Sequence, residues 1–378
     1  MLKSPRAIMP GLLAAVLVAT GLQARPAEAA AQPNVAEILT LASHASGKQA
    51  FKATRTQIVT RQDSNYPASA KLDYRDGSNY QIALTQPKEI NGLNLMLEHS
   101  KLTVYFPGES LVFVSDVAAA ADEVKDLVMG KLTDDPNQVL ANYNVTVAPE
   151  MDVVALYPCY KLTLAPKRGY GAGNPPGHRF WIAKETGIAM KEERFWSGDI
   201  QPYFSSQYDN FSTSRPPVIH LDVPAQVPKL KLVAGTPTNM TRYKTAEEAQ
   251  AAGKQVYLPT VIPAGFVLKA VDVMTIYGTD IVLLRYNDGV SNAVVTYRAK
   301  PLAFVALLAG ASALNLVNKI STLSYHAPNN YAIAEKGDKL VYGYGDLYPE
   351  SLQAMAASVP LPATTPKQGG LPALQANR

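Results

Sequence analysis

Hydrophobic and polar residues follow two different periods along this chain, and the changes of period divide it into helices and strands. Residues 35–45 place apolar side chains at helical spacing, which predicts one amphipathic helix at the start of the folded part. From residue 48 onward the period becomes two, and turn residues such as Pro87 separate the alternating runs. The alternation predicts a meander of antiparallel strands over residues 51–61, 68–75, 80–86, 93–99, 102–106 and 110–114.

A second block of strands follows after two predicted helices. Helical spacing returns over residues 118–132, and Pro136 suits the first turn of a further short helix. A sheet of about ten strands that helices interrupt buries its apolar faces most simply if it curls around the helices. We therefore predict an α+β fold built on a curved antiparallel sheet, an unclosed half-barrel filled by helices. The later strands are expected at 143–148, 153–164, 179–183, 188–195 and 203–211.

The most distinctive of these strands form a predicted hairpin over residues 179–196. Two runs rich in aromatic and apolar residues flank a short connection that ends at Gly187, as expected where the last turn residue is left-handed. The ionisable residues of the hairpin are Lys, Arg and Glu at the spacing of a solvated strand face. We therefore expect the hairpin to provide a surface rather than a reaction centre.

A smaller second domain is predicted after a proline-rich stretch. Residues 214–242 contain several prolines and no clear period, which predicts a stiffened linker. Residues 301–317 are apolar, but Ser312 and Asn315 favour a buried helix over a membrane span. The other predicted elements are helices at 245–253 and 349–359 and strands at 270–276, 281–286, 293–297, 331–334 and 339–344.

The first 29 residues have the features of a secretory signal peptide. A short positive start precedes an apolar run over residues 11–22 and a small-residue junction at 27–29, and this run is short for an uncleaved anchor helix. The predicted organisation is a signal peptide at 1–29, a half-barrel domain at 34–213, a linker at 214–242, an α/β domain at 243–359 and a disordered tail at 360–378.

Composition and charge argue against several functional classes. The formal net charge is +4, and removing the charges of the signal peptide lowers it to about +2. That charge is too small, without Lys/Arg clusters, to predict nucleic-acid binding. The single cysteine, Cys159, lies in a strand-like run and is expected to be a buried thiol, the alternative being a reactive or intermolecular one.

No pattern in the sequence predicts catalysis, a cofactor or a metal ion. The five histidines are scattered, without the spacing of a zinc site, and no Gly-x-Ser-x-Gly motif is present. The glycine-rich residues 169–177 lack the Lys-Ser/Thr of a phosphate loop and join strand to strand, so we expect a hairpin loop there. We therefore predict that the protein is not an enzyme.

Large apolar side chains in the strands offer two interpretations. They pack as core under the helices, or they line an apolar groove that takes an acyl chain or an extended peptide. By alternation, Trp181 faces the side of the sheet opposite to Phe180. The candidate groove residues are Met96, Phe113, Trp181, Met190 and Trp196.

Several segments resemble one family of bacterial envelope proteins. Residues 159–166 (CYKLTLAP) and 178–191 (HRFWIAKETGIAMK) are similar to the hairpins of the MucB/RseB periplasmic regulators, and more distantly to the carriers LolA and LolB. Residues 258–266 (LPTVIPAGF) and 284–289 (LRYNDG) resemble the small second domain that distinguishes MucB/RseB from the carriers. The resemblance covers residues 35–359.

The resemblance implies a periplasmic regulator without enzymatic activity. Such a protein has a LolA-like unclosed barrel followed by a small α/β domain, and it binds the extracytoplasmic part of a membrane anti-sigma factor and shields it from proteolysis. Lipid or lipopolysaccharide is implied to reverse this binding. The alternative function is that of a periplasmic carrier of lipid or lipoprotein, in which the apolar strand residues hold the cargo.

Overall fold

The structure is a computed structural model of the whole chain. It describes residues 34–45, 49–99, 101–107, 111–116, 132–133, 135–169, 173–196, 200–217, 221, 223, 229–231, 240–276, 279–299, 329–337 and 339–362. The predicted signal peptide and the helices predicted at 118–132 and 301–317 lie outside these residues, except for Leu132.

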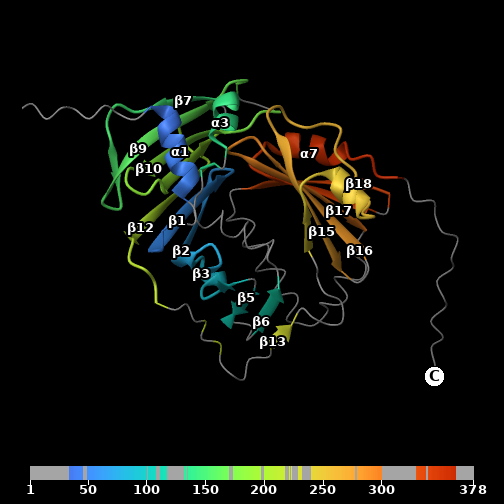
Figure 1. Ribbon diagram of the computed structural model, residues 1–378, viewed down its shortest axis with the longest axis horizontal. Coiled ribbons are helices and arrows are strands. Elements are labelled where there is room, and N and C mark those ends of the chain that lie inside the picture. Colours follow the sequence, from blue (N-terminus) through green and yellow to red (C-terminus); the bar gives the residue numbers. More distant parts are fainter. Residues whose placement is uncertain are drawn as a thin grey trace, which may run out of the picture. The chain divides into compact units, whose positions relative to one another are not determined.

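The larger of two sheets has 13 strands in an open order (Figure 1). The order is β13-β6-β5-β4-β3-β2-β1-β12-β11-β10-β9-β7, and β8 pairs with β9 beside this path. All neighbours pair antiparallel except β13 and β6. The unclosed antiparallel sheet predicted from the alternation is therefore confirmed. Its strands are β1 (Phe51–Arg61), β2 (Ser64–Asp76), β3 (Asn79–Gln86), β4 (Asn94–Glu98), β5 (Lys101–Phe106), β6 (Leu111–Asp116), β7 (Tyr143–Val147), β8 (Asp152–Val154), β9 (Tyr157–Pro166), β10 (Gly177–Ala183), β11 (Ala189–Phe195), β12 (Phe204–Ser212) and β13 (Lys229–Lys231).

The two described helices of this part of the chain begin with side-chain caps. At the start of α1 (Val35–Ala45), the Asn34 side chain accepts the backbone N–H of Glu37 at 2.9 Å, and the Glu37 carboxylate accepts the backbone N–H of Asn34 at 3.1 Å. At the start of α3 (Pro136–Asn142), Asp135 accepts the backbone N–H of Gln138 at 3.1 Å. These bonds satisfy backbone groups that the first helical turn leaves unpaired.

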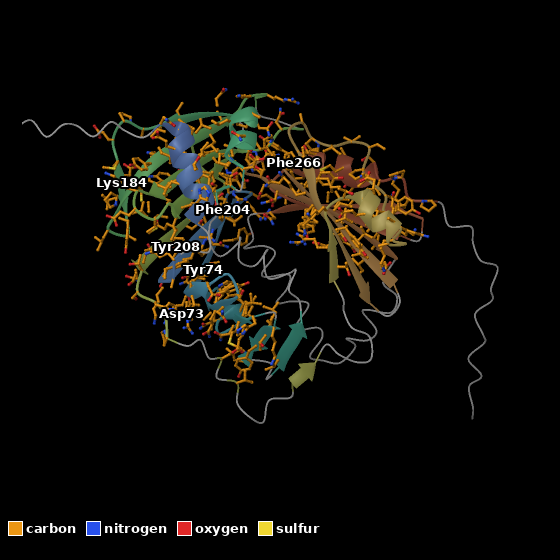
Figure 2. All side chains as sticks on the ribbon, in the orientation of Figure 1. Asp73, Tyr74, Lys184, Phe204, Tyr208 and Phe266 are labelled. Carbon is orange, nitrogen blue, oxygen red and sulfur yellow. The ribbon has the colours of Figure 1, made fainter. Side chains whose placement is uncertain are left out.

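Alternation along β10 divides its side chains between two core clusters. Phe180 and Ile182 are buried in the cluster that contains Ile38 and Leu39 of α1, which crosses β9 and β10 in Figure 1. Trp181 instead belongs to a cluster spread over the neighbouring strands, so it does not lie under α1. In that second cluster, Phe51 stacks on Tyr74 at 5.1 Å between ring centroids and contacts Tyr208 at 5.8 Å; the two tyrosines are labelled in Figure 2.

Cys159 is buried in the same second cluster, as expected for a core thiol. Burial raises its pKa to about 11, because the thiolate would have to exist in an apolar environment. The thiol is therefore protonated and unreactive in the folded protein.

The strand predicted over residues 153–164 is wrong in one respect, because a tight turn divides it into β8 and β9. Ala155 and Leu156 both have positive φ angles, 48° and 72°. Hairpin turns with two such residues usually contain Asn, Asp or Gly, so the sequence carries no signal for this turn. Leu156 is consequently 92% exposed at the tip of the hairpin.

The second sheet has six strands in the order β14-β15-β16-β17-β19-β18. Its strands pair antiparallel, and β15 to β19 correspond to the predicted runs. The elements are β14 (Met240–Tyr243), α4 (Ala246–Ala251), β15 (Val267–Ile276), β16 (Thr279–Asn287), β17 (Asn292–Ala299), β18 (Asn330–Lys336), β19 (Lys339–Gly345) and α7 (Pro349–Ala357).

Helix α7 packs closely on one face of this second sheet. Leu352, Met355 and Ala356 are buried in a cluster with the inward residues of β15 to β19. Where α7 crosses β19, a Cβ atom on Gly343 would lie 2.8 Å from the Leu352 carbonyl oxygen, so glycine permits the approach. Each sheet therefore has its own apolar core.

The turn of the β10–β11 hairpin should be highly sensitive to substitution at Gly187. Its φ is +73°, and a Cβ atom there would lie 2.5 Å from the carbonyl oxygen of Leu41 in α1. We expect Gly187→Ala to lower the free energy of unfolding by about 3 kcal/mol, through backbone strain and overpacking together. Urea denaturation measures this change. Gly169→Ala is the matched control, because its φ is +80° with nothing within 4 Å, and it should cost about 1 kcal/mol. Equal effects of the two substitutions would contradict the packing of α1 against this turn.

Candidate functional site

Polar side chains connect the two sheets at the turn between β16 and β17. Asp288 Oδ1 accepts the backbone N–H groups of Val290 and Ser291 at 3.0 and 2.7 Å, which shapes the turn. Its other oxygen, Oδ2, accepts a hydrogen bond from the Tyr143 hydroxyl of β7 at 2.7 Å. Asp288 thus supports its own turn and binds the first sheet at the same time.

Helix α3 fixes the same turn from its other side. Asn142 donates to the Asp288 carbonyl oxygen at 2.7 Å, and Gln138 donates to the Asn287 carbonyl oxygen at 2.8 Å. Gly289 has a φ of +107°, and a Cβ atom there would lie 2.8 Å from the backbone nitrogen of Val139. Only glycine allows α3 and the turn to come this close.

His178 of β10 lies next to the turn and is 1% exposed. Its Nε2 is 3.1 Å from the Ser291 hydroxyl, and its ring stacks on Phe180 with centroids 5.6 Å apart. Its Nδ1 is 3.7 Å from the nearer carboxylate oxygen of Glu192 on β11. That distance is beyond a hydrogen bond but within electrostatic reach.

Arg194 forms the centre of a charged group that also spans both sheets. Its Nε donates to Glu192 Oε1 at 2.6 Å, and its Nη1 donates to Asp346 at the end of β19. Asp346 Oδ2 accepts the backbone N–H of Asn292 at 2.8 Å. The three charged side chains are between 5% and 14% exposed. The Arg194 guanidinium also lies over the ring of Phe204, which Figure 2 labels.

The environment shifts the pKa values of these groups in opposite directions. Burial alone would raise the pKa of Glu192, but the charge of Arg194, the hydrogen bond that Arg194 donates and the nearby His178 ring hold it well below its ordinary value. For Asp288, burial prevails over the donated hydrogen bonds and raises its pKa. Burial and the nearby Asp288 also raise the pKa of the Tyr143 hydroxyl well above its ordinary value. Glu192 is therefore a stable carboxylate, and Tyr143 stays protonated.

Aromatic side chains complete this contact. Trp196 stacks on Tyr203 with centroids 4.1 Å apart and nearly parallel rings. The Trp196 ring also contacts that of Tyr348, which precedes α7, with centroids 4.2 Å apart. We refer to the set Tyr143, His178, Glu192, Arg194, Trp196, Asp288, Ser291, Asp346 and Tyr348 as the inter-sheet cluster.

Ser291, His178 and Glu192 have the order of a nucleophile, a base and an orienting carboxylate. Two features argue against nucleophilic chemistry. Ser291 is 0% exposed and His178 1%, so no substrate reaches the hydroxyl. Glu192 is bonded to Arg194 rather than to the imidazole, so it does not select the tautomer of His178. Among the described residues, no three His, Cys, Asp or Glu side chains lie close enough together to hold a metal ion.

The structure distributes the five candidate groove residues over several places. Trp181 and Met190 are buried together in the second cluster of the large sheet. Met96 packs at a small separate cluster with Tyr105, and Trp196 belongs to the inter-sheet cluster. Phe113 lies on β6, and its backbone faces those of Val104 and Leu230; its side chain lies outside what the structure describes.

Sequence reasoning did not find the charged part of the inter-sheet cluster. The hairpin charges were expected on a solvated strand face, and this expectation is wrong for Glu192, which is buried, and for Arg194, whose side chain is only 14% exposed. The reason is tertiary, because their neutralising partner Asp346 lies about 150 residues later in the chain. Nothing in the sequence showed that the Asp288 side chain is buried.

No model of a known protein family matches the chain, and no curated protein matches its sequence. Among solved structures, the crystal structure of MucB superposes with a TM-score of 0.50 at 14% identity, covering 85% of this chain and 96% of that one. The Pseudomonas aeruginosa MucA/MucB complex gives 0.48 at 13% identity, covering 87% and 99%. A LolA superfamily protein from Nitrosomonas europaea gives 0.23 at 13% identity, covering 48% and 94%. The chain therefore shares the fold of MucB over most of its length.

Arg194 should be the most sensitive residue of the inter-sheet cluster. We expect Arg194→Met to lower the free energy of unfolding by about 3 to 5 kcal/mol, because it leaves two buried carboxylates unpaired. Urea denaturation followed by the fluorescence of the two tryptophans, Trp181 and Trp196, measures the stability. The matched control is Lys52→Met, which removes one partner of an exposed ion pair with Asp73 and should change stability by less than about 1 kcal/mol. A small effect of Arg194→Met would contradict the burial of this cluster.

The free energy of unfolding should depend on pH in part through the ionisation of Glu192. Its pKa in the folded protein is lowered, so the stabilisation is complete above the ordinary value of 4.5 and is lost as the pH falls below it. We expect the difference in unfolding free energy between the wild type and Glu192→Gln to be largest near about pH 7 and to shrink towards about pH 3. Asp288 titrates in both proteins, so its contribution cancels in this difference. A difference that grows on acidification would exclude the assigned ionisation of Glu192.

Proposed function

We propose that this protein is a periplasmic regulator without enzymatic activity, which binds the extracytoplasmic part of a membrane anti-sigma factor and shields it from proteolysis. The observation that carries the proposal is the MucB fold, which extends over 85% of this chain and 96% of MucB. The local resemblances at 159–166, 178–191, 258–266 and 284–289 fall in the same order along the chain. A likeness that spans both sheets favours the regulators, because the small second domain is what distinguishes the MucB/RseB family from the carriers.

The proposed domain division is a half-barrel at 34–213 and a smaller domain at 243–359, connected by residues 214–242. Each sheet has its own apolar core, and the contact between them is made by the polar inter-sheet cluster. Polar contacts of this kind hold two domains in a defined geometry while allowing them to separate at moderate cost. Such an arrangement suits a protein that presents a surface to a polypeptide partner.

The absence of enzymatic activity is part of the proposal. It is supported by the inaccessibility of the Ser291 hydroxyl and by the engagement of Glu192 with Arg194. The proposed location is the periplasm, reached through the signal peptide at residues 1–29. None of the described helices is long and apolar enough to cross a membrane.

Lipid sensing by the first domain is a further part of the proposal. It is supported by the apolar side chains of the large sheet, of which Trp181 and Met190 share one cluster. A carrier of lipid or lipoprotein would use the same side chains to hold cargo. The two functions differ in what remains bound to the purified protein, since a carrier retains lipid and a regulator retains a polypeptide.

Recovery of a membrane partner tests the proposal. The full-length chain, with its signal peptide retained and an affinity tag at its C-terminus, is expressed in its own cells, crosslinked and purified from detergent-solubilised membranes. We expect enrichment of a single-span membrane protein, whose isolated extracytoplasmic fragment binds with a dissociation constant of about 1 μM or lower in calorimetry. We also expect the purified protein to slow proteolysis of that fragment.

Two controls separate this outcome from non-specific capture. An unrelated periplasmic protein with the same tag, expressed and crosslinked in the same way, should not enrich this membrane protein and should not protect the fragment from protease. If no membrane protein is enriched and native mass spectrometry instead shows bound lipid, the carrier function replaces the regulator. Rapid proteolysis of the bound fragment would contradict the shielding role.

A further inference from the structure

The hairpin formed by β8 and β9 presents apolar side chains to water at its outer end. Leu156 in the turn is 92% exposed, Val153 of β8 is 67% exposed and Met151 just before β8 is 46% exposed. Residues 153–160 contain no charged side chain. Single exposed apolar residues are common on protein surfaces, but these lie within one short hairpin and form a local apolar surface. We refer to Met151, Val153 and Leu156 as the apolar tip.

The backbone of this turn is strained for the residues that occupy it. Ala155 has a φ of 48° and Leu156 a φ of 72°. A Cβ atom makes this conformation unfavourable, so Asn, Asp or Gly normally fill such turns. Leu156 is thus unsuited to the backbone and also unfavourably exposed to water. Because strained residues are concentrated at functional positions, the exposed side chain of Leu156 is a candidate for binding.

The inner side of the hairpin is fixed to the core of the first sheet. Val154, Ala155 and Tyr157 pack against the cluster that contains Phe51 and Trp181. The ring of Tyr157 contacts that of Phe211 edge-on, with centroids 5.2 Å apart. The core therefore supports the apolar tip, and a supported tip loses little conformational entropy when it binds.

Tryptophan and lysine side chains surround the base of the hairpin. Trp181 donates its Nε1–H to Asp152 at 2.7 Å, and the amines of Lys161 and Lys191 lie 5.2 and 4.3 Å from the centroid of a Trp181 ring. The two lysine side chains are 35% and 27% exposed. An apolar end followed by tryptophan and lysine matches the order of acyl chains and headgroups at a membrane surface.

We propose that the apolar tip inserts into the surface of a phospholipid bilayer and holds the first sheet against the membrane. A bilayer accepts single apolar side chains without a complementary surface, whereas a specific protein interface usually takes about 800 Å² of each partner. A narrow hairpin with few exposed apolar side chains fits the bilayer better. Insertion by about 5 to 10 Å removes Leu156 and Val153 from water and leaves the lysines among the headgroups.

This inference does not rest on the proposed function, because no anti-sigma factor takes part and no lipid leaves the bilayer. The charges near the tip are of both signs. Lys161 pairs with Asp152, and Glu150 precedes the hairpin. The adjacent β10–β11 turn, where the backbone N–H of Lys184 donates to the Pro158 carbonyl oxygen at 2.9 Å, also carries Glu185; Figure 2 labels Lys184. Apolar insertion therefore outweighs attraction to anionic headgroups.

Vesicle flotation gives the first test. The mature chain, beginning near residue 30, lacks the apolar run of residues 11–22, which would itself bind membranes. It should float with vesicles of phosphatidylethanolamine and phosphatidylglycerol, and raising NaCl from about 0.05 to 0.3 M should change the partition coefficient by less than about twofold. Leu156→Asn should lower that coefficient about tenfold or more, because it removes the apolar side chain.

The same substitution separates binding from stability. Asn tolerates a positive φ better than Leu, so the urea midpoint of Leu156→Asn should equal or exceed that of the wild type. The matched control is Ile200→Asn, because Ile200 is 84% exposed in the connection between β11 and β12. It should float as the wild type does.

A fluorescent label gives the second test. Leu156→Cys carries a nitrobenzoxadiazole label, whose emission should rise on addition of vesicles and be quenched by lipids with a nitroxide on the acyl chain. Ile200→Cys with the same label should show neither change. The native Cys159 is buried, so the wild-type protein should remain unlabelled.

The proposal is overturned if the wild type does not float, if Leu156→Asn floats equally well, or if the label at residue 156 is not quenched. Flotation that salt abolishes would assign binding to the charges instead of the tip. A wild type that does not float, but whose membrane partner is lost in Leu156→Asn, would assign the tip to that polypeptide. A wild type that floats and enriches no membrane protein contradicts the proposed function alone.

Discussion

The bridge formed by Arg194 is the interaction on which the arrangement of this protein most depends. Its guanidinium binds Glu192 from the first sheet and Asp346 from the second, and all three side chains are largely removed from water. Buried charges are tolerated only with their partners in place. The two sheets therefore have one favourable relative position at this contact, and any displacement would leave a charge unpaired.

The other residues of the inter-sheet cluster also join the two sheets through polar contacts of fixed geometry. Each sheet completes its own apolar core, so the two sheets are not joined through one shared core. Hydrogen bonds from Tyr143 and Asn142 to Asp288 and its turn supply directional contacts instead. Polar contacts of this kind add less to stability than apolar burial, but they specify geometry, and here we regard that as their main role.

The sequence predicted those parts of the fold that local patterns encode. Period-two alternation placed most strands, and the helical spacing of apolar residues placed α1. Prediction from the sequence failed where a residue distant in the chain determines whether a side chain is buried. Glu192 and Arg194 have the spacing of a solvated strand face, and only Asp346 makes them interior residues. The turn at Ala155 was missed for a different reason, because its residue types are not those that favour a positive φ.

The edge strand β18 shows the same division between local and tertiary information. The pattern of Tyr331, Ala332, Ile333 and Ala334 encodes a strand with one small-residue face, which α7 requires for close packing. Whether such a strand is central or at an edge depends on the order of the whole sheet. Strand β19 pairs with β17 on one side and with β18 on the other, which leaves β18 at the end of the order. Exposure of Tyr331 and Ile333 is therefore a consequence of topology.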